Sequence, residues 1–428
     1  MKVVICAVGS RGDIQPTIAL ARALTHAGHT ARLFTHEMFE AFARSHGIDF
    51  VPLPGDPTVA MMRTAVVELG NSPFRMARWL RENLKPVFGE LFRRTLDAVE
   101  GADVVVSASL SFAAFHVAEK LGIPAVSVQF QPSTLTREHS GALIPQAPAW
   151  FPLKTLYNLA LTKVGNQTIF QLLRPLTNEC RRRVLGLPPL SVLYWWNVDA
   201  RDSDIPMIYA YSPEVLPRPR DWGAAKHVTG YWFLDQAPTF TPSGDLEAFL
   251  EAGPTPVYVG VGSIIDHHPD VTTRIVIDAA HRAGRRVVLQ SGWSGLGRAE
   301  LPRSVFVVDD VPHHWLFPKM AAVVHHGGAG TTATGLRAGL PTVIVPFFGD
   351  QYFWAWRVHE LGVGPSDLPR GLPRKRLSAE RLAAAVDEAV TDDRIRHRAQ
   401  ALSERLRAED GAARAVTILE EIAAAWPR

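Results

Sequence analysis

Two series of short apolar runs, joined by glycine-bearing turns and helical patterns, constrain the fold of this chain more than any other feature. The runs of the first series lie at 3–8, 31–35, 104–109 and 123–130. Buried parallel strands have this uninterrupted, β-branched character, and parallel neighbours need a helical crossover between them. We therefore predict a doubly wound α/β domain in the first half of the chain.

The second series repeats this architecture, and its runs lie at 256–262, 285–291, 304–309, 321–326 and 341–347. A length of 428 residues fits two or three domains. We predict an N-terminal domain over 1–214 and a C-terminal domain over 245–405. The segment 215–244 is rich in proline and glycine, which strand and helix interiors exclude, so we predict a linker there. Helical spacing without strand-like runs predicts a helical tail over 406–428.

Composition excludes several classes of protein. With 47% hydrophobic residues the chain has enough apolar material for full cores, and a net charge of +3 gives no reason to expect a nucleic-acid partner. The two cysteines, Cys6 and Cys180, form neither a disulfide framework nor a metal-type spacing. No apolar run is long enough to span a bilayer, and Val3 to Val8 is too short for a signal peptide. The default location is the cytoplasm.

The strongest local signal for a ligand is the strand-to-helix turn HHGGAGTTATG at 325–335. Its glycines let the backbone approach a ligand, Thr331 and Thr332 supply hydroxyls, and the free amides at a helix start attract an anion. A diphosphate is the natural occupant. The alternative is a tight turn that binds nothing.

Two aspartates follow other predicted strands. Asp350 combines with Gln351 to offer a carboxylate and an amide, a pair suited to several sugar hydroxyls. Asp13 follows the first run of the chain, where a partly desolvated carboxylate can accept a proton from a substrate hydroxyl. Either aspartate can instead be a helix N-cap. Open α/β sheets bind ligands at the carboxyl ends of their strands, which favours a site.

Three other patterns carry less weight. Asp202 and Asp204 provide too few oxygens for a hard cation, so no metal site is predicted. GVG at 260–262 lacks the third glycine of a dinucleotide fingerprint, which disfavours a nicotinamide enzyme. The segment 74–96 mixes apolar residues with six basic and two acidic ones. A solvated surface helix explains it best, with a weak membrane contact or an apolar substrate cleft as alternatives.

Taken together, these residues resemble a GT-B glycosyltransferase of the UDP-glycosyltransferase superfamily. The similarity is closest to the branch of sterol glucosyltransferases and vancomycin-type antibiotic glycosyltransferases. It covers nearly the whole chain and is most specific over 325–365. Other matching stretches are GSRGDIQPTIALARAL (9–24), THEMFEAF (35–42), PLPGDP (52–57), VTGYWFLD (228–235), VYVGVGSI (257–264), SGWSGLG (291–297) and VPHHWLFP (311–318). The resemblance implies an α/β fold of two Rossmann-like domains facing each other across a cleft.

The resemblance also implies an activity. A hexose, with glucose as the family default, moves with inversion and without metal or cofactor from a nucleoside diphosphate sugar to a hydroxyl of a hydrophobic small molecule. A UDP-sugar is the favoured donor and a TDP-sugar the alternative. The acceptor is a sterol, triterpenoid, polyketide or other natural product. Two further alternatives are a GT-B nucleotide-sugar epimerase and a catalytically silent relative that binds sugar nucleotides.

By the same resemblance Asp13 is the general base, and the stretch 107–112 offers it no acidic partner. The C-terminal domain holds the donor through Ser263, Trp293, Val311, His313, His325, His326, Gly327, Gly328, Ala329, Gly330, Thr331, Thr332, Asp350 and Gln351. On the N-terminal side we expect acceptor contacts from Arg11, Gln131, Trp150 and Trp195. Neighbouring aromatic residues suggest an apolar acceptor pocket, although core packing explains them equally well: Phe151, Tyr194 and Trp196.

Overall fold

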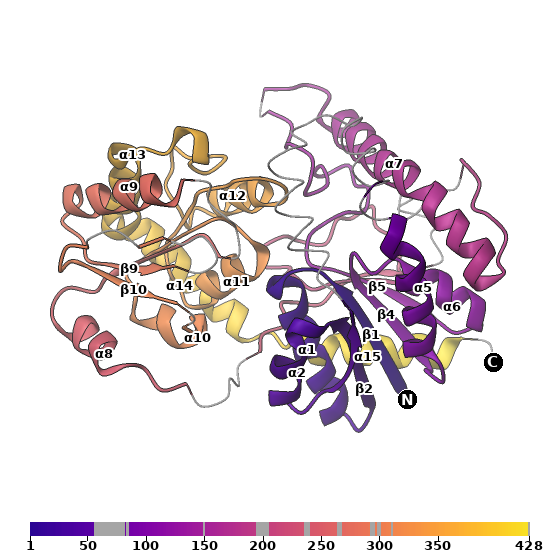
Figure 1. Ribbon diagram of the computed structural model, residues 1–428. Coiled ribbons are helices and arrows are strands. Elements are labelled where there is room, and N and C mark those ends of the chain that lie inside the picture. Colours follow the sequence, from indigo (N-terminus) through magenta and orange to yellow (C-terminus); the bar gives the residue numbers. More distant parts are fainter. Residues whose placement is uncertain are drawn as a thin grey trace.

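The computed structural model consists of two α/β bodies side by side, each built on a parallel sheet (Figure 1). The residues that the structure describes are 1–54, 82, 85–148, 150–193, 205–234, 240–262, 268–291, 296–297, 301–309 and 311–426. Ser263, Trp293, Trp195, Tyr194, Trp196, Asp202, Asp204 and most of the stretch 74–84 lie outside them.

The N-terminal sheet has the strand order β3-β2-β1-β4-β5-β6-β7, and its paired strands are parallel. Its strands are β1 (Lys2–Val8), β2 (Thr30–His36), β3 (Asp49–Leu53), β4 (Val104–Ser109), β5 (Ala125–Gln129), β6 (Met207–Tyr209) and β7 (Lys226–Val228). Its helices are α1 (Arg11–His26), α2 (Glu40–Ser45), α5 (Lys85–Val99), α6 (Ala113–Leu121) and α7 (Lys154–Cys180). The strand order reverses between β1 and β4, which is where open parallel sheets bind ligands.

The C-terminal sheet has the order β10-β9-β8-β11-β12 and reverses between β8 and β11. Its strands are β8 (Val257–Gly260), β9 (Val287–Gln290), β10 (Val305–Val308), β11 (Val323–His325) and β12 (Thr342–Ile344). Its helices are α8 (Gly244–Glu251), α9 (Pro269–Arg282), α10 (His313–Leu316), α11 (Ala329–Arg337), α12 (Gln351–Glu360), α13 (Ala379–Thr391) and α14 (Asp393–Arg407). The predicted pair of doubly wound domains is therefore confirmed.

The predicted linker at 215–244 needs a correction, because part of it belongs to the N-terminal sheet. Strand β7 pairs in parallel with β6, and the buried Trp222 ring stacks on Tyr209 at 4.7 Å between ring centroids. Arg218 donates to the carbonyls of Lys226 and Trp222 and closes the turn before the strand. A three-residue edge strand fits between prolines that a longer, central strand would exclude.

The C-terminal tail is helical, as predicted, but it does not end on its own domain. Helix α15 (Gly411–Ala425) packs on α1, and Leu419 is fully buried in the N-terminal core. Figure 1 shows this yellow helix beside the N-terminal sheet, far from α13. The chain crosses between the domains where Gly411 meets Gly230. A Cβ on Gly411 would lie 2.5 Å from the carbonyl carbon of Gly230, so the crossing requires glycine.

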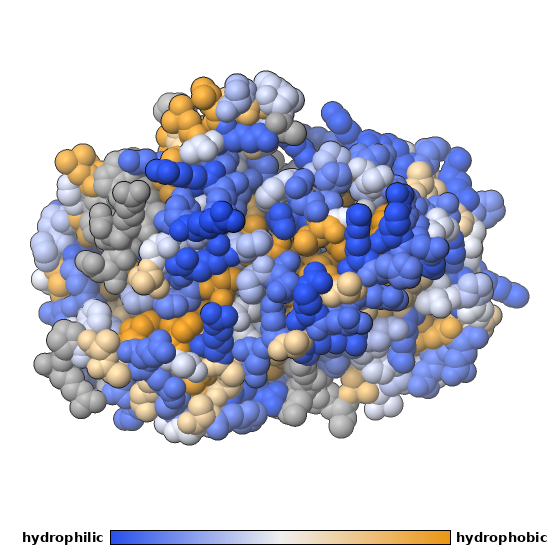
Figure 2. Space-filling model, turned by 180° about the vertical axis from the view of Figure 1, so that it is seen from behind, coloured by the Kyte–Doolittle hydropathy of each residue, from blue (hydrophilic) through white to orange (hydrophobic). Residues whose placement is uncertain are grey.

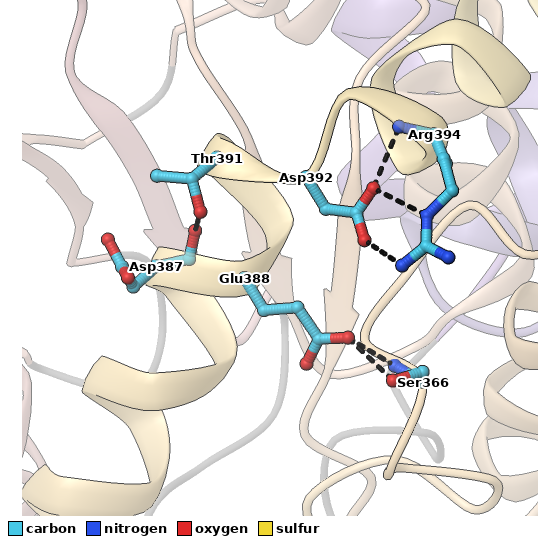
Figure 3. A network of polar contacts seen from close by, with 6 residues as sticks. All are labelled: Ser366, Asp387, Glu388, Thr391, Asp392 and Arg394. Carbon is cyan, nitrogen blue, oxygen red and sulfur yellow. Dashed lines mark hydrogen bonds and ion pairs between the residues drawn. The ribbon is translucent and has the colours of Figure 1, made fainter.

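A polar network fixes the junction of α13 and α14 at the far end of the C-terminal domain (Figure 3). Asp392 caps α14 by accepting from the backbone N–H of Arg394 at 2.7 Å, and Glu388 accepts from the hydroxyl of Ser366 at 2.7 Å. The Arg394 side chain lowers the pKa of Asp392 to about 2. These contacts lie at the surface where α13 ends and α14 begins.

Both cysteines are buried and free. Among the helices of the described ranges, none is long and apolar enough to cross a membrane.

Candidate active site at the domain boundary

The carboxyl ends of both sheets meet at the boundary between the domains, and the predicted site residues gather there. Asp13 follows β1 and Asp350 follows β12. Burial raises the pKa of Asp350 to about 6, and the nearby charge of Asp13 adds to that rise. Leu143, from the N-terminal domain, lies 3.8 Å from where a Cβ of Gly349 would be. Two carboxylates from different domains thus face one region.

Asp13 is held by three hydrogen bonds. The backbone N–H and the hydroxyl of Ser10, the N-cap of α1, donate to its Oδ2 at 2.8 and 3.1 Å. The hydroxyl of Ser109, at the end of β4, donates to its Oδ1 at 2.7 Å. A Cβ on Gly9 would lie 2.3 Å from Oδ2, so glycine is required there. Asp13 is therefore not the N-cap itself but the third residue of the helix, in a capping box.

Burial raises the pKa of Asp13, and the hydrogen bonds from Ser109 and Ser10 partly offset that rise. The side chain is nevertheless half-buried rather than enclosed. A carboxylate with a raised pKa is a stronger base once ionised, and partial exposure leaves it accessible to a substrate hydroxyl. This is the chemistry that the position of Asp13 supports.

The two histidines of the 325–335 turn differ in position. His325 is 1% exposed, and its Nδ1 accepts from the backbone N–H of Gly327 at 3.0 Å. Burial, together with His326 and His313, holds the pKa of His325 well below its usual range, so the ring is neutral. The structure thus places His325 inside the turn, where its ring holds the backbone at Gly327.

His326 is half-buried between two glycines. A Cβ on Gly262 would lie 2.6 Å from its Cε1, and one on Gly328 would lie 2.4 Å from its Nε2. Burial lowers the pKa of His326 to about 4, so at neutral pH the ring is an uncharged donor and acceptor. Of the two histidine rings, that of His326 is the more exposed at the start of α11.

Helix α11 begins at this turn with Gly328 as its N-cap. The first-turn amides of Ala329, Gly330 and Thr331 have no acceptor within the helix and can receive an anion. Thr332 differs from the prediction, because its buried hydroxyl donates to the carbonyl of Gly328 at 2.9 Å. Its hydroxyl therefore stabilises the helix start and is not offered to a ligand.

Asp350 is the N-cap of α12, as the alternative interpretation expected, but its side chain does not cap the helix. Its Oδ2 accepts from the indole N–H of Trp354 at 3.0 Å. The Oε1 of the neighbouring Gln351 accepts from the backbone N–H groups of Phe347 and Phe348 at 2.7 and 3.1 Å. Gln351 thus holds the loop before Asp350 and has its amide NH₂ left to donate to a hydroxyl.

Val311 and His313 lie at the carboxyl end of β10. Val311 is buried, and His313 begins α10 with its ring stacked on Phe317 at 4.4 Å between centroids. The Nε2 of His313 is 3.0 Å from the hydroxyl of Tyr258. These contacts fix the backbone at 311–313 at the same sheet edge as the 325–335 turn.

The predicted acceptor residues are more scattered. Arg11 is exposed as the first residue of α1, with its guanidinium 5.2 Å from the centre of the Phe42 ring, and Gln131 is half-buried. Trp150 is 80% exposed beside Phe151, which excludes core packing for its indole. It lies just before α7, whose Leu156 and Leu161 are also exposed. Seen from behind, the surface of the molecule carries apolar groups among hydrophilic ones (Figure 2).

Three residues of the site escaped the sequence interpretation. Ser109 contacts Asp13, and the exposed Leu110 follows it directly in the chain. Leu143 is exposed beside Gly349. Nothing in the sequence distinguishes these residues from other loop residues, because their roles depend on contacts between distant segments. Over the described ranges, no group of three or more His, Cys, Asp or Glu residues is arranged to hold a metal ion.

Known protein families match both halves of the chain. Residues 3–140 match the glycosyltransferase family 28 N-terminal domain, and residues 274–422 match the erythromycin biosynthesis protein CIII-like C-terminal domain. A sterol 3-beta-glucosyltransferase of Arabidopsis thaliana is 36% identical over 97% of this chain and 67% of its own length. The chain belongs to the UDP-glycosyltransferase superfamily and is a GT-B glycosyltransferase. A second Arabidopsis thaliana sterol 3-beta-glucosyltransferase is 37% identical, and this chain spans 64% of its length.

Further similar proteins include a fungal relative and two glycosyltransferases of known structure. A sterol 3-beta-glucosyltransferase of Leptosphaeria maculans is 36% identical, and this chain spans 29% of its length. The solved structure of the glycosyltransferase of kitacinnamycin has a TM-score of 0.69 at 20% identity, with 98% of both chains covered. The glycosyltransferase VinC in complex with dTDP has a TM-score of 0.64 at 19% identity and covers 99% of this chain and 100% of its own. These structures confirm the GT-B fold.

Proposed function

We propose that this glycosyltransferase transfers a hexose, with glucose favoured, from a nucleoside diphosphate sugar to the hydroxyl of a sterol or another hydrophobic small molecule. The observation that carries the proposal is the position of Asp13 after β1 and of Asp350 after β12, at the boundary where Leu143 approaches Gly349. One carboxylate suits an acceptor hydroxyl and the other suits the hydroxyls of a sugar. The named activity of the plant and fungal relatives supports a sterol as the first acceptor to test.

In the proposed reaction Asp13 removes the proton of the acceptor hydroxyl. The acceptor oxygen then forms a bond to the anomeric carbon from the face opposite the diphosphate, and the bond to the diphosphate oxygen breaks, which inverts the anomeric configuration. The electron pair leaves with the diphosphate. In this proposal the first-turn amides of α11 and the neutral His326 ring stabilise that charge by hydrogen bonding, and the transfer proceeds without a metal.

Two exposed leucines support a hydrophobic acceptor. Leu110 follows Ser109 and is 54% exposed, and Leu143 is 58% exposed next to Gly349. Apolar side chains beside both carboxylates fit an acceptor with an apolar skeleton and one reactive hydroxyl. A nucleotide-sugar epimerase would not need them, and the retained pair of Asp13 and Asp350 argues against a silent relative.

The donor base is proposed to be uracil, with thymine as the alternative. Calorimetric titration with UDP, TDP and UDP-glucose, without added metal, distinguishes the two. Micromolar binding of UDP and UDP-glucose supports uracil as the donor base. Tight binding of TDP alone would instead indicate a thymidine diphosphate sugar as the donor. A cytoplasmic location stays a prediction.

The activity itself is tested with UDP-glucose and cholesterol, with EDTA present, by mass spectrometry of the lipid product. Asp13→Asn keeps the shape of the side chain and removes the base, so we expect turnover to fall by about 10³-fold or more, with UDP-glucose affinity nearly unchanged. Near-normal turnover of Asp13→Asn would refute the assignment of the base. Interconversion of UDP-sugars without any acceptor would indicate the epimerase.

A further inference from the structure

Ser109 has an unusual backbone conformation at the end of β4. Among the non-glycine residues that the structure describes, it alone has a positive φ, at 52°. Left-handed backbone disfavours a residue with a Cβ, and it persists only where the surrounding structure imposes it. Such residues cluster at functional sites, so the direction of the Ser109 side chain is informative.

The turn around Ser109 is held by two buried serines. The hydroxyl of Ser111 lies 2.6 Å from the carbonyl oxygen of Cys6 in β1, and the hydroxyl of Ser107 donates to the carbonyl of Ser111 at 3.0 Å. Both hydroxyls point into the fold and satisfy backbone groups there. Of the three serines in this stretch, Ser109 is the one whose hydroxyl turns to Asp13, at 2.7 Å from Oδ1.

The donors on the two oxygens of Asp13 come from different elements. Both contacts on Oδ2 come from Ser10, the N-cap of the helix that carries Asp13. Ser109 brings the one contact on Oδ1, and it comes from the neighbouring strand. This contact ties the carboxylate to β4, across the point where the strand order of the sheet reverses.

We propose that Ser109 is a positioning residue for the catalytic base. Its hydroxyl orients Oδ1 of Asp13 toward the acceptor and keeps the carboxylate ionised until the acceptor hydroxyl arrives. The inference rests on the proposed role of Asp13. In the reaction, the acceptor proton passes to Asp13 while the acceptor oxygen bonds to the anomeric carbon and the diphosphate departs. Ser109 exchanges no atoms and acts by its hydrogen bond alone.

Charged groups near Asp13 enter the design of the test. Asp350 lies across the domain boundary and Arg11 lies two residues earlier on α1, whereas the turn at 107–111 carries no charge. Asp350 titrates with a pKa of about 6, in the range of interest. The pKa of Asp13 is therefore followed in an Asp350→Asn background as well as in the natural sequence.

The decisive experiment compares Ser109→Ala with Ser109→Asn and Ser111→Ala. Alanine removes the donor, and asparagine tolerates left-handed backbone and carries an amide that can donate. Ser111→Ala is the matched control, because it removes a neighbouring hydroxyl that contacts backbone carbonyls and the Ser107 hydroxyl but is not bonded to Asp13. Each is assayed across pH with UDP-glucose and cholesterol.

Loss of a hydrogen bond to an ionised carboxylate raises its pKa by about one unit or more. The reaction needs the ionised base, so the acid limb of kcat/KM should move to higher pH by about that amount in Ser109→Ala. We expect kcat to fall about tenfold or more, with KM for UDP-glucose unchanged. Ser109→Asn should return the acid limb of kcat/KM to its original pH. Ser111→Ala should lower thermal stability and leave the acid limb where it is.

A second measurement does not depend on turnover. The carboxyl carbon of Asp13, ¹³C-labelled and assigned by its loss in Asp13→Asn, is titrated by NMR. We expect a higher pKa in Ser109→Ala than in the unmodified protein. An unchanged pKa and pH profile, with Asp13→Asn inactive, would overturn the role of Ser109 and leave the proposed function standing. An active Asp13→Asn would instead overturn the base itself.

Discussion

At the scale of single residues, the site separates side chains that touch ligands from side chains that hold the backbone. His325 and His326 are neighbours with the same chemistry, yet one is 1% exposed and bonded to Gly327 and the other is half-buried between glycines. The Thr332 hydroxyl and the side-chain Oε1 of Gln351 likewise hydrogen-bond to backbone groups. In this turn, the polar atoms left for a ligand are therefore those that do not already hydrogen-bond to the backbone.

This distinction predicts different defects for the two histidines. His326→Ala should weaken UDP binding by about tenfold, since it removes one hydrogen bond to the diphosphate. His325→Ala leaves the N–H of Gly327 without its acceptor and should lower the free energy of unfolding by about 1 to 3 kcal/mol. Calorimetry and chemical denaturation measure the two effects. Equal losses of UDP affinity with no loss of stability would contradict the assignment.

Asp350 predicts a pH dependence of donor binding. Its pKa of about 6 lies above the ordinary aspartate value, so it becomes protonated as the pH falls from 7 to 5. The ionised form accepts hydrogen bonds from sugar hydroxyls and the protonated form accepts fewer. The affinity for UDP-glucose relative to UDP should fall over this range, and Asp350→Asn should abolish the dependence. A ratio that stays constant in the unmodified protein would remove Asp350 from the sugar site.

At the scale of elements, the crossing of the tail depends on the close approach of Gly230 and Gly411. Helix α15 starts at Gly411, and a Cβ there would meet the backbone of Gly230 at 2.5 Å. Backbone atoms cannot give way as the end of a flexible side chain can. The position of α15 is thus set at its first residue.

Gly411→Ala should therefore destabilise the protein by about 1 to 3 kcal/mol through overpacking. Gly244→Ala is a matched control, because Gly244 also begins a helix and a Cβ there meets nothing within 4 Å. It should change stability by no more than about 0.5 kcal/mol. Denaturant unfolding of both variants checks the pair, and similar stabilities would show that the crossing has room to relax.

At the scale of the whole molecule, several contacts link the two domains. Arg357 of α12 donates to the carbonyl of Val215 at 2.7 Å, and the ring of His139 contacts Phe353 with centroids 5.7 Å apart. Helix α15 completes the N-terminal core from the C-terminal end of the chain. Helix α12 thus rests on the N-terminal domain, so movement of either domain changes the distance between Asp13 and Asp350.

Docking of α15 makes the N-terminal domain depend on the last residues of the chain. Leu419→Ala creates a cavity against α1 and should cost about 2 to 5 kcal/mol. Hydrogen exchange should then rise in α1 and α15 and stay unchanged in β8 to β12. Glu421→Ala, at an exposed position of the same helix, is the control. Uniformly faster exchange in both sheets would indicate one cooperative unit instead.

The sequence by itself determined both parallel sheets, the helical tail, and the positions of Asp13, Asp350 and the 325–335 turn after strands. Periodicity and glycine placement are local properties, and they suffice for these features. The tertiary structure alone decided that β7 extends the first sheet, that α15 returns to α1, and that Ser109 faces Asp13. Each of these depends on contacts between segments distant in the chain, which residue type and spacing do not encode.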